Sequence, residues 1–247
     1  MQIKLHYLKD SNNESLAYYF NDNNSDTTLF FFGGYSSDMT GTKATALNNL
    51  SSKIGVNCVR FDYSGHGKSS GEFNKGTISK WSKEALTFFK KFKSKKNIII
   101  GSSMGSWIAL LVALKEKQNV HGIVGIASAT DFTAGEWNRL SKQEKIEFEK
   151  KGSILFPDNE YGDYEVSYIF VNDGLDNLLL ENKIELYCPV RLLHGRLDSV
   201  VPVSVSEKII EKIQSKDKSI KIIEDGEHSL SRDQDLEILY IQIQGLI

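Results

Sequence analysis

Gly101-Ser102-Ser103-Met104-Gly105 is the stretch that decides how this chain folds. It follows the apolar run Ile98-Ile99-Ile100 and leads into the strongly apolar segment 103–117, which has helical character. The pattern is G-x-S-x-G, in which a serine stands on a tight turn between a buried strand and a helix. The glycines leave room where side chains would clash, and the helix N-terminus offers N–H groups to a developing negative charge. The stretch therefore predicts Ser103 as a nucleophile and the Met104 N–H as an oxyanion donor.

The same letters occur a second time, in Gly67-Lys68-Ser69-Ser70-Gly71. This second match has no strand immediately before it and no apolar helix immediately after it, so we interpret it as a turn-rich loop. Ser102 is a neighbouring hydroxyl of the first match, but the spacing of the glycines selects Ser103.

On both sides of this stretch, short β-like runs alternate with helix-like segments, which is typical of a parallel sheet with crossover helices. The expected strands are a hairpin over residues 1–20 and the runs 27–32, 56–61, 97–100, 120–127, 190–193 and 219–223. The expected helices are 42–53, 78–92, 103–117, 203–213 and a last one starting at Leu230. The fold class is therefore α/β, with an eight-stranded, mostly parallel sheet flanked by helices.

The alternation breaks between residues 129 and 186, which are more polar, aromatic-dotted and helix-like. We expect residues 1–128 and 187–247 to form the α/β core, and 129–186 to be a helical lid over the carboxyl edge of the sheet. Trp137 and Arg139 in this lid are candidate substrate contacts, with Arg139 suited to a carboxylate. The alternative is a helix surface carrying a packed tryptophan.

A serine nucleophile needs a base within hydrogen-bond reach, and in this type of fold the acid and then the base follow the serine in the chain. Of five histidines, only His194 and His228 come late enough and at strand ends. His228 lies between the last strand and the last helix, and we predict it as the base. We interpret His194 as a histidine packed beneath the site.

Asp198 lies in the loop after the strand at 190–193. A carboxylate there can accept the Nδ1 proton of His228, which fixes the imidazole tautomer and stabilises the imidazolium. Asp225 and Glu227 are the competing acids, but side chains so close to the histidine in sequence rarely face its ring. We predict Asp198 as the acid.

The second oxyanion donor must come from the loop after the strand at 27–32, which ends in Gly33-Gly34-Tyr35. Glycine at position 34 lets the backbone approach the substrate. We predict the backbone N–H groups of Tyr35 and Met104 as the oxyanion hole, and the Tyr35 ring as a wall of the acyl pocket. Taken alone, the two glycines would indicate only a turn.

These pieces, in this order and with Asp62-Tyr63-Ser64-Gly65-His66-Gly67-Lys68-Ser69, resemble the α/β-hydrolase family across nearly the whole chain. A closer resemblance is to mitochondrial acyl-protein thioesterases, also described as acyl-glucuronide esterases, and to their bacterial relatives. It is carried by the segments 34–44, 60–65, 101–107 and 191–195. The resemblance implies acyl-enzyme chemistry on small acyl esters or thioesters by Ser103, Asp198 and His228, with S-acylated proteins as further candidate substrates and with no cofactor or metal.

Three other interpretations stay open at this point. The chain could be a general short-chain carboxylesterase, or use the same triad as a perhydrolase or peptidase. From another functional class, it could be a non-catalytic α/β-hydrolase scaffold that binds a ligand or a protein, because fold alone does not fix function.

The composition indicates an ordinary soluble protein, with 40% hydrophobic and 25% charged residues. A net charge of −2 predicts no nucleic-acid partner, and no apolar run is long enough for a membrane span. Cys58 and Cys188 lie in or beside apolar runs and are expected to be reduced thiols. The N-terminus resembles neither a signal peptide nor a transit peptide, so we predict a cytoplasmic location.

Overall fold

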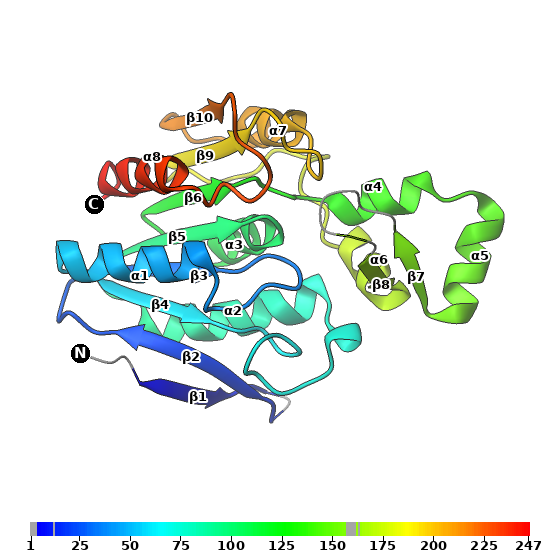
Figure 1. Ribbon diagram of the computed structural model, residues 1–247, viewed down its shortest axis with the longest axis horizontal. Coiled ribbons are helices and arrows are strands. Elements are labelled where there is room, and N and C mark those ends of the chain that lie inside the picture. Colours follow the sequence, from blue (N-terminus) through cyan, green and yellow to red (C-terminus); the bar gives the residue numbers. More distant parts are fainter. Residues whose placement is uncertain (1–3, 12, 157–161, 163) are drawn as a thin grey trace.

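An eight-stranded sheet runs through the molecule in the order β1-β2-β4-β3-β5-β6-β9-β10 (Figure 1). The computed structural model describes residues 4–11, 13–156, 162 and 164–247. The strands are β1 (Leu5–Lys9), β2 (Ser15–Asn21), β3 (Thr27–Phe32), β4 (Asn57–Phe61), β5 (Lys96–Ser102), β6 (Gly122–Ile126), β9 (Val190–Gly195) and β10 (Lys218–Ile223). Strand β2 runs antiparallel to its neighbours β1 and β4, and the remaining strands pair in parallel. The predicted mostly parallel sheet of eight strands is confirmed.

Helices cover both faces of this sheet. Those of the core are α1 (Thr42–Ile54), α2 (Ile78–Phe92), α3 (Met104–Lys115), α7 (Val203–Lys212) and α8 (Asp233–Gln244). Buried residues of α1 and α8 belong to one hydrophobic cluster, and those of α2, α3 and α7 belong to another. The sheet separates the two clusters, so it is the middle one of three layers.

The alternation of side chains along the buried strands explains these layers. In β3, Leu29 and Phe31 face the α1–α8 cluster, whereas Phe30 and Phe32 face the α2–α3 cluster. Every residue of β3 is buried. A strand that is covered on both faces has no polar side, which is why β3 and β5 have continuous apolar runs in their sequences.

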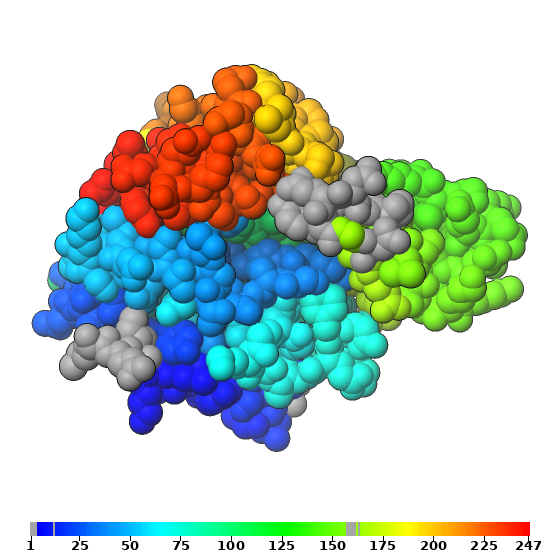
Figure 2. All heavy atoms as spheres, in the orientation of Figure 1, coloured from blue at the N-terminus to red at the C-terminus, as the bar shows by residue number. Residues whose placement is uncertain are grey.

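Between β6 and β9 the chain forms a separate set of elements, which project from the core (Figures 1 and 2). They are α4 (Phe132–Arg139), α5 (Lys142–Lys151), the antiparallel pair β7 (Ser153–Phe156) and β8 (Tyr164–Ser167), and α6 (Tyr168–Leu175). A 3-10 turn, η1 (Phe73–Lys75), precedes α2. The lid boundaries of 129 and 186 remain a prediction, and residues 157–161 and 163 within them lie outside the described residues.

The last helix begins later than predicted, at Asp233 rather than Leu230. Leu230 has a φ of 40° and lies buried in the α1–α8 cluster. A positive φ is incompatible with a right-handed helix. Residues 229–232 therefore extend the loop that carries His228, and the helix starts only after Arg232, where the Asp235 carboxylate accepts the Arg232 N–H at 3.0 Å.

Candidate active site

Ser103 stands at the turn between β5 and α3 in a strained backbone conformation. Its φ is 54° and its ψ is −120°, in a region that a residue with a side chain rarely adopts. Its N–H is held by the carbonyl of Ile126 at 2.8 Å, and its own carbonyl accepts from Ala129 at 3.2 Å. These bonds to the end of β6 hold the turn in the strained shape, which a serine nucleophile at this position requires.

The two flanking glycines are needed because there is no space for a side chain. A Cβ on Gly101 would lie 2.4 Å from the carbonyl oxygen of Gly105, and a Cβ on Gly105 would lie 2.1 Å from that of Phe32. The first turn of α3 thus packs directly on the ends of β5 and β3. The spacing of the glycines reflects this close approach of backbones.

Ser103, His228 and Asp198 form a continuous chain of hydrogen bonds. The Oγ of Ser103 lies 3.1 Å from Nε2 of His228, and Nδ1 of the same ring lies 2.8 Å from Oδ2 of Asp198. A carboxylate can only accept, so Nδ1 carries the proton and Nε2 can accept one from the serine. The three residues that the sequence predicted as nucleophile, base and acid are brought together in this order.

The meeting of Asp198 with His228 depends on a close approach of two loops. A Cβ on Gly195 would lie 2.2 Å from the carbonyl oxygen of Gly226, and that carbonyl accepts from the Leu197 N–H at 2.8 Å. The loop after β9 and the loop after β10 are therefore in backbone contact. This contact aligns an acid and a base that are thirty residues apart in sequence.

The Asp198 carboxylate is fully buried and has partners on both oxygens. Oδ1 accepts from the N–H groups of Val200 and Val201 at 3.0 and 2.7 Å, while Oδ2 faces both His228 and Nε2 of His194, the latter at 3.2 Å. Burial alone would raise the pKa of Asp198, but the hydrogen bonds from the two histidines outweigh it and hold the pKa well below the usual range. Asp198 is therefore ionised at neutral pH.

His194 lies beneath the site, as the sequence analysis expected. It is fully buried, its Nδ1 lies 2.7 Å from the hydroxyl of Ser206, and its Nε2 lies 2.9 Å from the carbonyl of Val201. Its Nε2 must carry the proton, because a carbonyl can only accept. His194 thus supports the Asp198 loop and does not reach Ser103.

The loop after β3 brings Gly34 and Tyr35 next to the nucleophile. A Cβ on Gly34 would lie 3.3 Å from that of Ser103, so this position has room for little more than backbone. Within the described part of the chain, the N–H of Tyr35 donates to no acceptor, and the N–H of Met104, the first residue of α3, has no intrahelical acceptor. Two backbone donors beside Ser103 thus remain available for an oxyanion.

Asp62 and Arg60 anchor the far end of this loop, a role that the sequence analysis did not assign. Oδ1 of Asp62 accepts from the Met39 N–H at 2.6 Å, and the guanidinium of Arg60 donates to the Met39 carbonyl at 2.5 Å. The other oxygen of Asp62, Oδ2, accepts from the backbone N–H of Lys68 at 2.8 Å. Both residues lie at the end of β4, so the loop that carries Tyr35 is attached to the sheet itself.

A cavity of about 460 Å³ opens in front of Ser103, within the size range of small-molecule sites. Its lining includes Gly34, Tyr35, Ser103, Met104 and His228. The Tyr35 ring forms part of the wall, and its hydroxyl donates to the backbone of the β7–β8 pair at 3.0 Å. Burial raises the pKa of this phenol above its usual value, so it stays protonated.

The two predicted substrate contacts of the lid do not line this cavity. Trp137 packs against Tyr168 with Lys145 over its ring, and Arg139 donates to Glu136 at 3.1 Å. Glu136 does line the cavity, although the sequence analysis did not single it out. Helical geometry places positions 136 and 139 on one face, but which of them reaches the cavity depends on how α4 packs.

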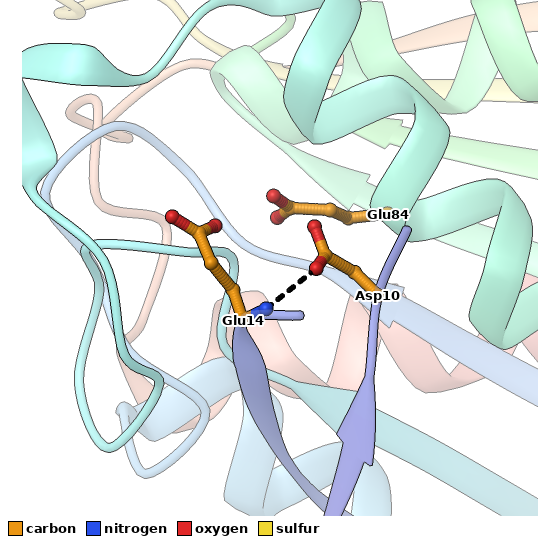
Figure 3. A group of neighbouring side chains, drawn as sticks. All are labelled: Asp10, Glu14 and Glu84. Carbon is orange, nitrogen blue, oxygen red and sulfur yellow. Dashed lines mark hydrogen bonds between the residues drawn. The ribbon is translucent and has the colours of Figure 1, made fainter. Parts of the chain in front are cut away.

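Asp10, Glu14 and Glu84 bring carboxylate oxygens within 4.8 Å of one another, the one such group of three that we find in the described parts of the chain (Figure 3). Protein partners already occupy these carboxylates: Lys80 pairs with Glu14 at 2.9 Å, and Ser64 donates to Glu84 from its N–H and its hydroxyl at 2.8 and 2.6 Å. None of the three lines the cavity at Ser103. We assign no metal site to this group.

Comparison with known proteins places the chain in a family. A family model described as serine aminopeptidase, S33, matches residues 23–169 and 174–235, which is most of the chain. The chain belongs to this hydrolase family. It is therefore an α/β-fold hydrolase, and the predicted fold class and enzyme class are confirmed.

Individual relatives show which members of the family this chain is similar to. The human mitochondrial palmitoyl-protein thioesterase ABHD10 is 34% identical over 215 residues, which is 86% of this chain and 70% of the relative. Among solved structures, a hydrolase of Agrobacterium vitis S4 is 36% identical over the full length of both chains, with a TM-score of 0.93. The mouse α/β-hydrolase domain-containing protein 10 is 32% identical over 98% of each chain, also with a TM-score of 0.93. The predicted resemblance is confirmed.

The predicted cytoplasmic location is wrong by this comparison, because the curated relatives are mitochondrial proteins by name. The prediction rested on two unpaired cysteines and on the character of the N-terminal residues. Reduced thiols indicate a reducing environment but do not identify the compartment. No helix within the described residues has the length and apolar character that a membrane span needs.

Proposed function

We propose that this hydrolase cleaves acyl thioesters, including S-palmitoylated proteins, through an acyl-enzyme on Ser103. The observation that carries the proposal is the 3.1 Å contact between Ser103 Oγ and His228 Nε2, two residues that line the cavity. Acyl transfer needs a nucleophile and a base within hydrogen-bond reach of each other, and a third group that orients the base.

The proposed first half-reaction forms the acyl-enzyme. Ser103 Oγ attacks the acyl carbonyl while His228 Nε2 takes its proton, and the imidazolium is stabilised by the buried carboxylate of Asp198. The backbone N–H groups of Tyr35 and Met104 donate to the oxyanion. When the carbonyl reforms, the bond to the leaving sulfur breaks, and the His228 imidazolium gives its proton to that sulfur, which departs as a thiol.

The second half-reaction uses the same groups. His228 takes a proton from water, whose oxygen attacks the acyl carbon, and the collapse of the tetrahedral intermediate returns the proton to Ser103. A carboxylic acid is released and the enzyme is regenerated. No group beyond these side chains and water is required for the balance of atoms and protons.

Two observations favour an apolar acyl group. The cavity lining beyond the triad includes Phe31, Ala129, Phe132 and Val201, whose side chains offer apolar surface. The curated relatives are named palmitoyl-protein thioesterases, which points to a long acyl chain on a thiol. A general short-chain carboxylesterase is the outcome if thiol leaving groups are not preferred.

The experiment compares S-acyl and O-acyl substrates of equal chain length. Acyl-CoA, S-palmitoyl peptides and p-nitrophenyl esters from two to sixteen carbons are assayed with the wild type and with Ser103→Ala. We expect kcat/KM to rise with chain length and to be higher for thioesters than for esters of the same acyl group. Ser69→Ala is the matched control, because it removes the serine of the second G-x-S-x-G match.

Two results would contradict the proposal. Turnover confined to short esters would make the chain a carboxylesterase. Absence of turnover together with absence of fluorophosphonate labelling at Ser103 would favour a binding scaffold of the same fold.

A further inference from the structure

The loop that carries His228 is held at three places: at its start, at its end, and in its middle next to His228. At its start, Gly226 accepts from Leu197 at 2.8 Å. At its end, Arg232 pairs with both Asp225 and Asp235 at 2.9 Å. The middle of the loop, next to His228 itself, contacts the protein through a lysine of another element.

That lysine is Lys43, in the first turn of α1. Its Nζ donates to the carbonyl of Ser229, the residue after His228, and lies 3.3 Å from the hydroxyl of Ser231. The same hydroxyl donates to the Ser229 carbonyl at 2.9 Å. Lys43 and Ser231 thus share one backbone carbonyl directly beside the base.

The loop needs such a contact because its backbone is strained. Leu230 has a φ of 40°, which is costly for a residue with a branched side chain, and a strained residue persists only where its surroundings hold it. The Leu230 side chain is buried on one side of the loop. Lys43 holds the loop at the neighbouring Ser229, and both residues line the cavity in front of Ser103.

We propose that Lys43 is a positioning residue, which holds the carbonyl of Ser229 and thereby keeps the His228 ring in line with Ser103. The inference rests on the proposed function, since it assigns His228 as the base. Lys43 acts through the backbone of the loop, and it is not assigned a contact with the reacting atoms.

The surroundings of Lys43 make this test practicable. Burial is the main influence on its amine and lowers the pKa to about 8, while Asp235 acts in the opposite direction. The fold therefore bears a desolvation cost for this cation, and replacing it by methionine, which has a similar length, relieves that cost. We expect Lys43→Met to remain folded.

The experiment separates the rate of acylation from substrate binding. Wild type, Lys43→Met, Lys43→Arg and the control Lys53→Met, an exposed lysine in the last turn of the same helix, are assayed with a small uncharged p-nitrophenyl ester. The rate of covalent labelling by a fluorophosphonate is measured in parallel, and thermal unfolding checks the fold. A small uncharged ester and a small phosphonate present no anionic group for Lys43 to bind.

For Lys43→Met we expect kcat and the labelling rate to fall together by about 10- to 100-fold, because small misplacements of a catalytic group have effects of this size. KM should change by less than about 3-fold. The loss of a contact that binds the substrate would instead raise KM and leave kcat unchanged. Lys43→Arg should recover part of the rate, since arginine still donates to a carbonyl. Lys53→Met should match the wild type.

Other results would overturn the inference. An unchanged labelling rate in folded Lys43→Met would do so, as would a rise in KM with kcat unchanged, which marks a substrate contact. If Lys43→Met does not fold, Lys43→Gln decides, because its shorter side chain loses the contact with the Ser229 carbonyl: a labelling rate equal to that of the wild type would overturn the inference, and a slower one would support it. Failure of the proposed function is a separate result, namely a wild type that the fluorophosphonate does not label at Ser103.

Discussion

Two stretches of this chain have the same G-x-S-x-G letters, and the structure uses their serines in opposite ways. Ser103 presents its hydroxyl to His228 at 3.1 Å in front of a cavity. Ser69 has its hydroxyl engaged by the backbone: it donates to the carbonyl of Asp62 at 2.7 Å and accepts from the Ala17 N–H at 2.8 Å. One serine is available for chemistry, whereas the other joins the loop to β2 and β4.

The glycines of the two stretches are also there for different reasons. Gly101 and Gly105 have no room for a side chain, because backbone atoms of neighbouring elements lie 2.4 and 2.1 Å from the positions that their Cβ atoms would take. Gly67 and Gly71 have φ values of +46° and +99°, which by themselves favour glycine, and a Cβ on Gly67 would meet the Asp62 side chain at 2.2 Å rather than backbone. The comparison teaches that the pattern identifies a nucleophile only where a strand and a helix converge on it.

The largest expected effect concerns the first serine. Ser103→Ala should lower kcat by several orders of magnitude, on the scale of about 10⁶ known for removal of a triad serine, because the acyl-enzyme cannot form. Steady-state hydrolysis of an acyl thioester and fluorophosphonate labelling both measure this. Wild-type turnover in Ser103→Ala would contradict the assignment of Ser103, rather than Ser69, as the nucleophile.

The next effect concerns the loop of the second stretch, which is attached to Glu84 through Ser64. Burial raises the pKa of Glu84 from 4.5 to about 7, and the hydrogen bonds from Ser64 only partly oppose it. The folded pKa lies above the unfolded one, so this contribution to stability is complete below about pH 4.5 and is lost as the pH rises through about 7.

Ionisation of Glu84 should thus cost the fold about 3 kcal/mol. Glu84→Gln should remove this part of the pH dependence, measured as the free energy of urea unfolding at pH 5 and pH 8. Parallel pH dependences in the variant and the wild type would contradict the assignment. Ser103 should be labelled by the fluorophosphonate in both proteins, because Glu84 does not line the cavity.

The glycines give a smaller effect that sharpens the comparison. Gly105→Ala should destabilise the fold by about 2–3 kcal/mol, since the added methyl group meets backbone oxygens that cannot move away. It should also slow catalysis, because those oxygens belong to the end of β3 that leads to Gly34. Gly71→Ala should reduce the unfolding free energy without slowing fluorophosphonate labelling.

Gly135→Ala in α4 is the control for these glycine variants, since nothing lies within 4 Å of its added methyl group. Its thermal midpoint should equal or exceed that of the wild type. Equal fluorophosphonate labelling rates for Gly105→Ala and Gly71→Ala would contradict the prediction that only the glycines around Ser103 affect catalysis.

The smallest effect concerns the second serine. Ser69→Ala should destabilise the fold by about 1 kcal/mol, because two backbone groups lose a partner at a half-exposed position. Its kcat on thioesters should stay within a factor of about two of the wild type. A large loss of kcat at unchanged stability would give Ser69 a role in chemistry that its hydrogen bonds do not suggest.

Local patterns were good predictors wherever neighbouring residues decide the structure. The helix over residues 78–92 begins and ends as its apolar spacing predicts, and Thr77 caps it by accepting from the Lys80 N–H. The last helix begins three residues later than the sequence predicts, because the buried position of Leu230 is decided by contacts with α1 and α8 rather than by its neighbours in sequence. Trp137 and Arg139 were placed at the cavity by residue type, while the packing of α4 turns Glu136 toward it instead.

The sequence by itself determined the layered sheet, the turn at Ser103 and the order in which nucleophile, acid and base follow one another, because strand and helix periodicity and close glycine spacing are properties of short segments. The tertiary structure alone decided which residues besides the nucleophile line the cavity, and that Gly195 meets Gly226 so that Asp198 reaches His228. It also decided that Lys43 contacts the loop of the base. These are contacts between segments far apart in the chain, and their geometry depends on how whole elements pack, which no local pattern records.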